Sequence, residues 1–287
     1  MTTYPNLSHP NTRLAGRIPQ FNLKHAEIRH VLTRSRTLEL RQNRAKQKIA
    51  NGEVATVIGG ITHADDIDAI GQFGFDGVWL EGEHGAVDAA DIGNLTRACD
   101  MWGMTSVVRI NLNEQGLIYR TFDRGAQSIV VPHVNNAAEA KNVVEGGKFA
   151  PIGKRGLYTS RQGYGVDNYL KKANDETMLI VLIEDITAWE NLDEILAVDD
   201  IDVFFVAPSD FAASMGHIGE LDHPDVQEKI NDALTRIVAS GRTAGTLVSN
   251  ENVGKYVGMG VKFFLTNIGP WIQAGFAQYQ ANVNSAK

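Results

Sequence analysis

The stretch "GVWLEGEHGAVD", residues 77–88, places titratable side chains directly after a short apolar run. A strand that feeds a packed core usually ends in turn residues such as Gly, Asn or Asp. This run instead ends in Glu81, Glu83 and His84. Carboxylates can bind cations and a histidine can move protons near neutral pH. The stretch therefore predicts a strand whose far end faces a polar site.

Polar side chains follow other apolar runs of the chain as well. They are Arg109, Pro132-His133, Glu184-Asp185, Pro208-Ser209-Asp210, Ser249-Asn250 and Thr266-Asn267. If the runs are parallel strands of one barrel, their carboxyl ends meet at one rim, where such barrels carry their chemistry. Carboxylates, an arginine and two histidines at one rim predict an active site.

Glu184 and Asp210 are the candidate ligands of a divalent cation. Glu184 ends the most apolar run of the chain, where a buried charge is costly unless a cation compensates it. Paired oxygen ligands without cysteine favour Mg²⁺ or Mn²⁺ over zinc. For Asp210 taken alone, capping a helix is the commoner role of an aspartate, so the sequence leaves that alternative open.

The remaining candidates also have structural alternatives. Arg109 suits an anion-binding role and a structural ion pair about equally. We expect His133 to be a core histidine with its hydrogen bonds satisfied. Asp185 and Glu83 are expected to be helix caps or supporting groups.

Eight apolar runs decide the predicted fold. They cover residues 56–58, 78–80, 107–109, 129–131, 179–183, 203–206, 245–248 and 263–265. Segments with apolar residues at helical spacing separate most of them, which is the pattern of a parallel sheet covered by helices. Eight repeats favour closure, and the nucleotide-binding glycine motifs of open sheets are missing from the sequence. We predict an α/β fold, a TIM (β/α)8 barrel.

The length suits one such barrel with an extension, because a barrel needs about 250 residues. We assign residues 38–287 to the barrel, beginning with a basic helix candidate over 38–53. Residues 1–37 are polar and contain Pro5, Pro10 and Pro19, so we expect an extension against the surface or a neighbouring subunit. The long segment 134–178 is rich in Gly, Arg, Lys and Tyr, and we expect it to form a loop over the active site.

Composition excludes several classes of protein. A formal charge of -7 argues against nucleic-acid and membrane partners. The sole cysteine, Cys99, excludes an intrachain disulfide and suits a reducing compartment. The sequence has no apolar run of membrane-spanning length and no pattern typical of a signal peptide. We expect a cytoplasmic enzyme acting on small molecules.

At these residues the sequence resembles the HpcH/HpaI family of metal-dependent pyruvate aldolases, which act on 4-hydroxy-2-oxoheptanedioate and 2-keto-3-deoxy sugar acids. The matching stretches are "GFDGVWLEGEHG", "VVRINLN", "FDRGAQSIVVPHVNNAAEA", "FAPIGKRGL", "ANDETMLIVLIED" and "VFFVAPSDFAASMG", in family order over residues 38–285. The resemblance implies a TIM barrel whose last helix is exchanged between subunits, in a homohexamer or trimer.

By motif, the resemblance implies that Glu184 and Asp210 hold a divalent cation, Mg²⁺, Mn²⁺ or Co²⁺. Arg109 would bind the keto-acid oxygens, with Ser209 and Glu81 as further substrate-binding candidates. His84 would move protons, with Asp123 as its partner, although the predicted topology puts Asp123 ahead of the fourth strand, at the opposite end of the barrel.

Three positions depart from the family pattern. Glu81 stands where an aspartate is usual, Ile58 aligns with a common tryptophan, and Leu182 replaces a glutamine or methionine. We expect these changes to reshape the pocket and to affect the aldehyde partner more than the shared chemistry.

The predicted reaction is that of a class II aldolase, a carbon–carbon lyase. It reversibly cleaves a 4-hydroxy-2-keto acid to pyruvate and an aldehyde through a metal-bound enolate. No predicted strand end offers a lysine for a Schiff base. Decarboxylation of oxaloacetate and carbon–carbon bond formation from the same enolate are alternatives. A non-catalytic barrel, with Glu184 and Asp210 as helix caps, is a further one.

Overall fold

The computed structural model describes residues 38–286, and residues from Leu38 onward form one compact unit. The predicted extension, residues 1–37, lies outside the described residues. Among the described residues, every helix is too short or too polar to cross a bilayer.

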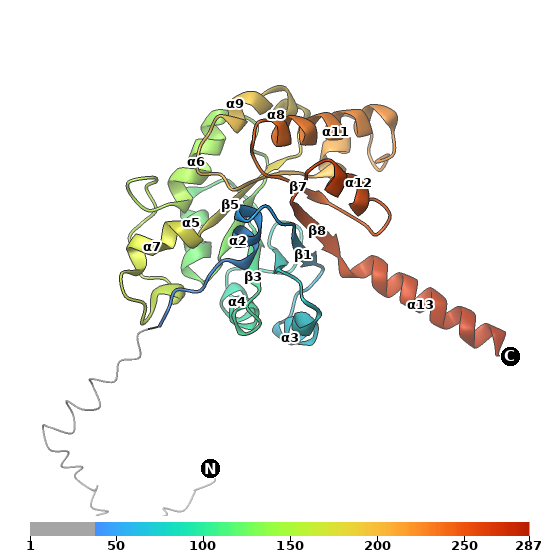
Figure 1. Cartoon of the computed structure of the whole chain (residues 1–287), viewed down its shortest axis with the longest axis horizontal. Coiled ribbons are helices and arrows are strands. Elements are labelled where there is room, and N and C mark those ends of the chain that lie inside the picture. Colours follow the sequence, from blue (N-terminus) through green and yellow to red (C-terminus); the bar gives the residue numbers. More distant parts are fainter. Residues whose placement is uncertain (1–37, 287) are drawn as a thin grey trace, which may run out of the picture. The chain divides into compact units, whose positions relative to one another are not determined.

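Eight parallel strands close into a barrel in chain order. Figure 1 shows several of these strands at the centre of the barrel domain. Their bounds are β1 Ala55–Gly59, β2 Gly77–Glu81, β3 Thr105–Arg109, β4 Ser128–Val131, β5 Met178–Ile183, β6 Val203–Val206, β7 Ala244–Leu247 and β8 Phe263–Asn267. Closure is made by β1 and β8, which pair from Ala55 with Phe263 to Gly59 with Asn267. The predicted TIM barrel is confirmed.

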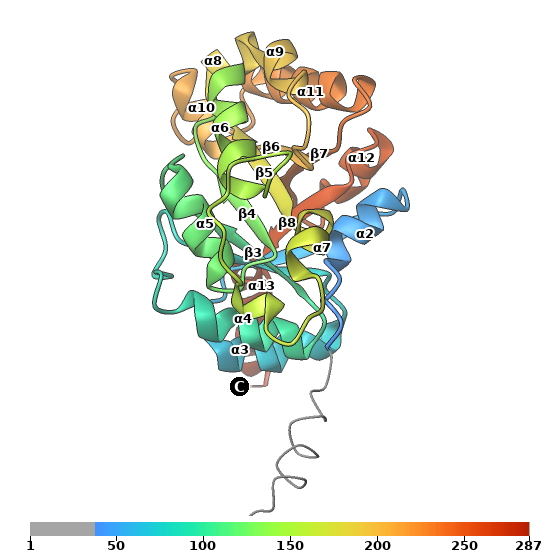
Figure 2. The same cartoon turned by 90° about the vertical axis from the view of Figure 1, so that its left-hand side faces the viewer.

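Helices surround the strands in both views (Figures 1 and 2). They are α2 Arg44–Ala50, α3 Ala64–Ile70, α4 Ile92–Met101, α5 Gln115–Asp123, α6 Ala137–Gly147, α7 Tyr169–Glu176, α8 Ile186–Glu190, α9 Leu192–Leu196, α10 Pro208–Ser214, α11 Pro224–Ala239, α12 Val253–Gly258 and α13 Ile268–Ser285. Two short 3-10 helices complete the described part of the chain, η1 Gly71–Phe73 and η2 Arg161–Gly163.

Alternation along the strands sorts their side chains into two layers. One layer fills the barrel interior and includes Val57, Trp79, Val107, Leu182 and Phe205. The intervening residues pack outward against the helices. Successive side chains on a strand point to opposite faces, so residues two positions apart point to the same face. Glu81, Arg109 and Glu184 each stand two positions after an interior residue, namely Trp79, Val107 and Leu182. The strands therefore direct these three polar residues toward the barrel axis at its carboxyl-terminal rim.

The amino-terminal end of the barrel is closed by α2. Its Ala45 is fully buried in the interior layer, and its N-cap, Asn43, accepts the backbone N–H of Lys46 at 3.1 Å. The predicted helix over 38–53 is thus shorter than expected, because Asn43 starts it and Asn51 ends it.

The segment between α6 and β5 was expected to cover the active site, and that expectation is wrong within one chain. It leads into the amino-terminal end of β5, so it lies at the end of the barrel opposite the rim. Its Arg155 bonds Asp123, its Gln162 bonds the carbonyl of Gly125, and Gly165 accepts from the Leu38 N–H.

The last helix, α13, extends away from the barrel (Figure 1). None of its described residues is buried. Ile272, Phe276 and Tyr279 are each more than half exposed, at 62%, 61% and 63%. Such a helix has little to hold it within a single chain.

Candidate active site

Glu81 and Arg109 form the centre of the rim between β2 and β3. The strands pair these two residues directly, and Arg109 Nε donates to both Glu81 oxygens, at 3.0 and 2.8 Å. Arg109 Nη1 lies 2.9 Å from Glu83 Oε2. Burial opposes ionisation of Glu81, but hydrogen bonds from Trp79 and Arg109 outweigh it and lower the pKa of the Glu81 carboxyl. The guanidinium is therefore held in place by two carboxylates.

Two glycines let the "GEHG" segment fold back over the strand ends. A Cβ on Gly82 would stand 2.6 Å from the carbonyl oxygen of Arg109, and one on Gly85 would stand 2.6 Å from that of Glu81. The turn is closed by Glu81 Oε1, which accepts the N–H groups of Glu83 and His84 at 2.9 and 3.1 Å. The polar ending of β2 is thus a turn built around its own carboxylate.

Glu184 is the most deeply buried acidic group at the rim, with 1% of its surface exposed. It accepts the backbone N–H of His133 at 2.7 Å. Burial, together with the charges of Asp210 and Glu83, raises the pKa of Glu184 to about 7 despite the opposing effect of His133. A carboxylate in this setting lacks a full positive counter-charge.

Asp210 lies in the first turn of α10 and lines the rim cavity together with Ser209. The capping alternative is not what is observed, because Ala207 is the N-cap of α10 and no side chain caps this helix. Glu184 does not cap α8 either, since the N-cap there is Asp185. Both carboxylates are left for another role.

His133 is not the core histidine that was expected. Its side chain is 60% exposed, with Nδ1 at 3.0 Å from Asp185 and 3.3 Å from Glu184. The hydrogen bond to Asp185 raises the pKa of His133. Its backbone has a φ of 52°, a left-handed conformation that costs a non-glycine residue free energy. The N–H of this residue is the one that bonds Glu184.

Glu83 has a more central position than the sequence indicated. Besides its contact with Arg109, it lies 3.8 Å from His84 Nε2 and 4.0 Å from His133 Nε2. Its side chain is only 9% exposed, whereas that of His84 is 69% exposed. The parity of β2 does not reach this residue, because the turn begins at Gly82.

Asp123 is not brought to this rim within one chain. It ends α5, where its Oδ1 accepts from Arg155 Nη2 at 2.9 Å. The Arg155 guanidinium also lies over the rings of Phe122 and Phe149, with centroids at 4.9 and 4.4 Å. In the single chain Asp123 is therefore part of a largely buried ion pair.

A cavity of about 420 Å³ opens at the carboxyl-terminal rim of the barrel. Its polar lining includes Glu81, Arg109, Ser209 and Asp210, and its apolar lining includes Trp79, Leu182 and Phe205. Leu182 therefore contributes an apolar wall, as expected. Ile58 does not, because it packs in the outer layer against the helices, and that expectation is wrong.

Comparison with known proteins agrees with this description. Residues 60–265 match the family model described as HpcH/HpaI aldolase/citrate lyase. The chain is 37% identical over 210 residues to the hydroxypyruvate/pyruvate aldolase of Cupriavidus necator, covering 71% of this chain and 78% of that one. It is 34% identical over 214 residues to the 4-hydroxy-2-oxo-heptane-1,7-dioate aldolase of Salmonella heidelberg, covering 73% and 81%.

A solved structure shows the same architecture. The HpcH/HpaI aldolase/citrate lyase family protein from Burkholderia cenocepacia matches with a TM-score of 0.79 and 25% identity, covering 85% of this chain and 100% of that one.

A closed barrel with ionisable groups at its carboxyl-terminal rim defines a TIM-barrel enzyme. The family match narrows this class to the carbon–carbon lyases of the aldolase type. The chain belongs to the HpcH/HpaI aldolase/citrate lyase family.

Proposed function

We propose that this enzyme reversibly cleaves a 4-hydroxy-2-keto acid to pyruvate and an aldehyde, with a divalent cation held by Glu184 and Asp210. The observation that carries the proposal is the buried Glu184 carboxylate, whose charge lacks a full counter-charge beside Asp210. The names of the aldolase relatives from Cupriavidus necator and Salmonella heidelberg support the same reaction class.

The residues at the rim fit a hard cation. Burial and the charge of the neighbouring Asp210 both disfavour the ionised form of Glu184. A bound cation would compensate the negative charges of these two carboxylates. Neither carboxylate is used as a helix cap. An all-oxygen donor pair favours Mg²⁺ or Mn²⁺, with Co²⁺ as a further candidate. When bound, such an ion supplies Lewis-acid stabilisation of the negative charge that develops on the keto acid.

Arg109 is the group that we assign to the keto-acid oxygens. The hydrogen bonds and ion pairs among the described residues use its Nε and Nη1. Its Nη2 is therefore available to a substrate oxygen, and Glu81 and Glu83 fix the plane of the guanidinium. A donor that is already oriented stabilises developing negative charge without reorganisation. Ser209 and Glu81, which line the same cavity, are our further substrate-binding candidates.

His84 is the group that we assign to move the proton of the substrate's 4-hydroxyl. Its side chain is exposed at the rim, and its Nε2 lies near Glu83. The predicted partnership with Asp123 needs a second copy of the chain, because Asp123 pairs with Arg155 at the other end of this barrel. Assembly as a trimer or hexamer is therefore part of the proposal, with α13 exchanged between subunits.

Pyruvate release from a panel of 4-hydroxy-2-keto acids tests the proposed function. We expect one aldehyde per pyruvate, loss of turnover with EDTA, and recovery when Mg²⁺ or Mn²⁺ is restored. Glu184→Gln and Asp210→Asn should be inactive while melting cooperatively. Release of CO₂ from oxaloacetate without any aldehyde turnover would favour the decarboxylase instead. No turnover with any cation would leave a non-catalytic barrel.

A further inference from the structure

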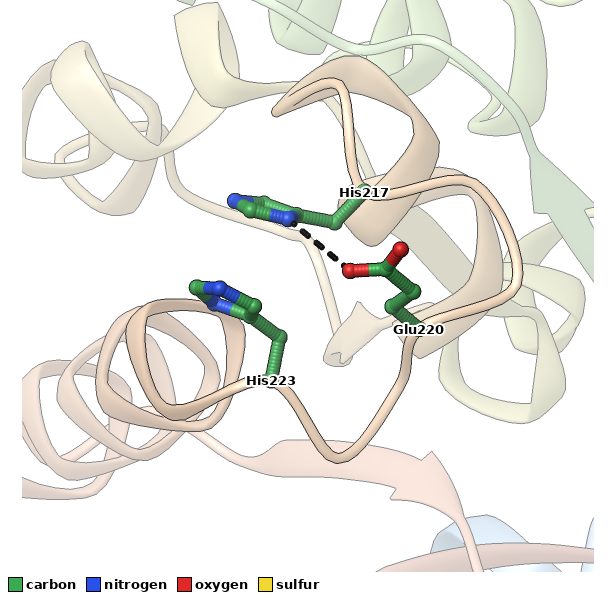
Figure 3. Close-up of side chains that lie close together, drawn as sticks. All are labelled: His217, Glu220 and His223. Carbon is green, nitrogen blue, oxygen red and sulfur yellow. Dashed lines mark hydrogen bonds and ion pairs between the residues drawn. The ribbon is translucent and has the colours of Figure 1, made fainter.

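A second cluster of side chains of metal-ligating types lies between α10 and α11, at the opposite end of α10 from Asp210. It consists of His217, Glu220 and His223, which converge on one side of the loop (Figure 3). One ligand atom from each of the three lies within 4.8 Å of the others. The proposed aldolase reaction makes no use of them.

The loop that carries the cluster is held by its own backbone. Glu220 N–H bonds the carbonyl of His217 at 3.1 Å, and His223 N–H bonds that of Glu220 at 3.0 Å. Two successive turns of this kind return every third residue to the same side. Gly219 lies inside the first of these turns and has a φ of 79°, while Gly216, with a φ of 86°, stands directly before His217; other residues rarely adopt such values. The backbone of the loop therefore holds the side chains of His217, Glu220 and His223 near one another without a bound ion.

The side chains already contact one another. His217 Nδ1 lies 3.4 Å from Glu220 Oε2. The two imidazole rings stack with centroids 3.7 Å apart and planes inclined by 25°. A purely structural role accounts for His223, whose Nδ1 accepts the N–H of Asp225 at 3.3 Å as the N-cap of α11. It does not account for His217 and Glu220.

We propose that His217, Glu220 and His223 bind a divalent transition-metal ion of the zinc type. Two imidazoles and one carboxylate suit Zn²⁺, Co²⁺, Ni²⁺ or Cu²⁺, in contrast to the all-oxygen pair at the rim. The rings must turn out of their stack so that their lone pairs converge. Both histidines are partly exposed and Glu220 is 65% exposed, so solvent gives them room to do so.

An ion at this position joins the end of α10 to the start of α11. It would bind the folded chain and not the unfolded one, and so it raises the melting temperature as its concentration rises. This effect does not depend on the aldolase reaction.

Equilibrium dialysis of the full chain against Zn²⁺, in buffer with excess Mg²⁺, tests the site. We expect His217→Ala to bind one equivalent less than the unchanged chain, and so should His223→Asn, which keeps a side chain that can cap α11. Glu220→Gln should weaken this equivalent by about tenfold. The matched control is His63→Asn, because His63 is an exposed histidine before α3, outside the cluster.

The melting temperature gives a second readout. Zn²⁺ should raise it in the unchanged chain and in His63→Asn, and raise it less in the cluster variants. The proposal is overturned if all variants bind the same number of equivalents, or if His63→Asn loses as much zinc as His217→Ala.

Discussion

At the scale of single residues, Glu184 makes the stability of the cation-free protein depend on pH. Burial raises its pKa to about 7, well above the ordinary value of a glutamate. At pH values between the ordinary pKa of a glutamate and this raised pKa, Glu184 therefore holds its proton in the folded state and loses it in the unfolded state. Its contribution to the free energy of unfolding is greatest at low pH and is lost as the pH rises through this window.

Glu184→Gln should remove this dependence, because the amide does not titrate. In EDTA, the free energy of unfolding of the unchanged chain should fall relative to that of Glu184→Gln by on the order of 2 kcal/mol between about pH 5 and pH 8. Urea denaturation at both pH values measures the difference. Parallel pH profiles for the two proteins would contradict it. Mn²⁺ at the higher pH should stabilise the unchanged chain more than the variant.

Arg109→Lys tests whether the guanidinium geometry matters for catalysis. A lysine has one ammonium group and cannot contact Glu81, Glu83 and a substrate oxygen with the fixed geometry of a guanidinium. We expect kcat/KM for pyruvate release to fall by about 100-fold or more. Arg120→Lys, on the exposed part of α5, is the control and should keep its activity. An equal loss in both variants would argue against the assigned role.

The sequence indicated the direction of some rim side chains but not the surroundings of others, for a physical reason. Arg109 and Glu184 each stand two positions after an inward-pointing apolar residue of a strand, so the direction of their side chains can be predicted from the sequence. His133 and Glu83 lie where that parity ends. Their positions depend on a left-handed backbone and on a turn closed by Glu81, which no spacing of apolar residues reveals.

At the scale of elements, α2 is held against the barrel by Asn43. Its Nδ2 donates to the Gln127 carbonyl, to Ser128 Oγ and to the Glu176 carbonyl, and its Oδ1 accepts from Thr105 Oγ1. Asn43 and both hydroxyl residues are fully buried. One amide thus joins α2 to β3, β4 and the end of α7.

Asn43→Ala should lower the free energy of unfolding by about 3 kcal/mol, because it removes the helix cap and takes one hydrogen bond from each of the buried hydroxyls of Thr105 and Ser128. Asn51→Ala at the exposed end of the same helix is the control, and its effect should stay within about 0.5 kcal/mol. Chemical denaturation of both variants measures the difference. Equal effects would mean that the buried hydrogen bonds of Asn43 contribute little.

The positions of the strands could be predicted from the sequence, but the place of the long segment between α6 and β5 could not. All eight apolar runs became strands, because a buried parallel strand must be apolar on both faces. The segment after α6 was predicted from composition alone, and composition does not say at which end of a barrel a loop lies. Chain order does, since a segment that follows a helix and precedes a strand lies at the amino-terminal end.

At the scale of the whole molecule, α13 has no buried residue and exposes large apolar side chains. An 18-residue helix is about 27 Å long and is marginally stable alone in water. Gly275 in its interior weakens it further. Ile272, Phe276, Tyr279 and Val283 follow helical spacing and form one apolar stripe. We infer that a neighbouring copy covers this stripe, consistent with the subunit exchange that the family resemblance implies.

Placing charges on this stripe should dissociate the assembly. We expect the unchanged chain to be a trimer or hexamer by size-exclusion chromatography with light scattering, and Ile272→Glu with Phe276→Glu to form smaller species, because two buried carboxylates would face an apolar surface. Gln278→Glu with Asn282→Asp adds the same charge to α13 away from the stripe and should leave the assembly intact. A monomeric unchanged chain would contradict the exchange, whereas equal dissociation of both variants would show that added charge alone is responsible.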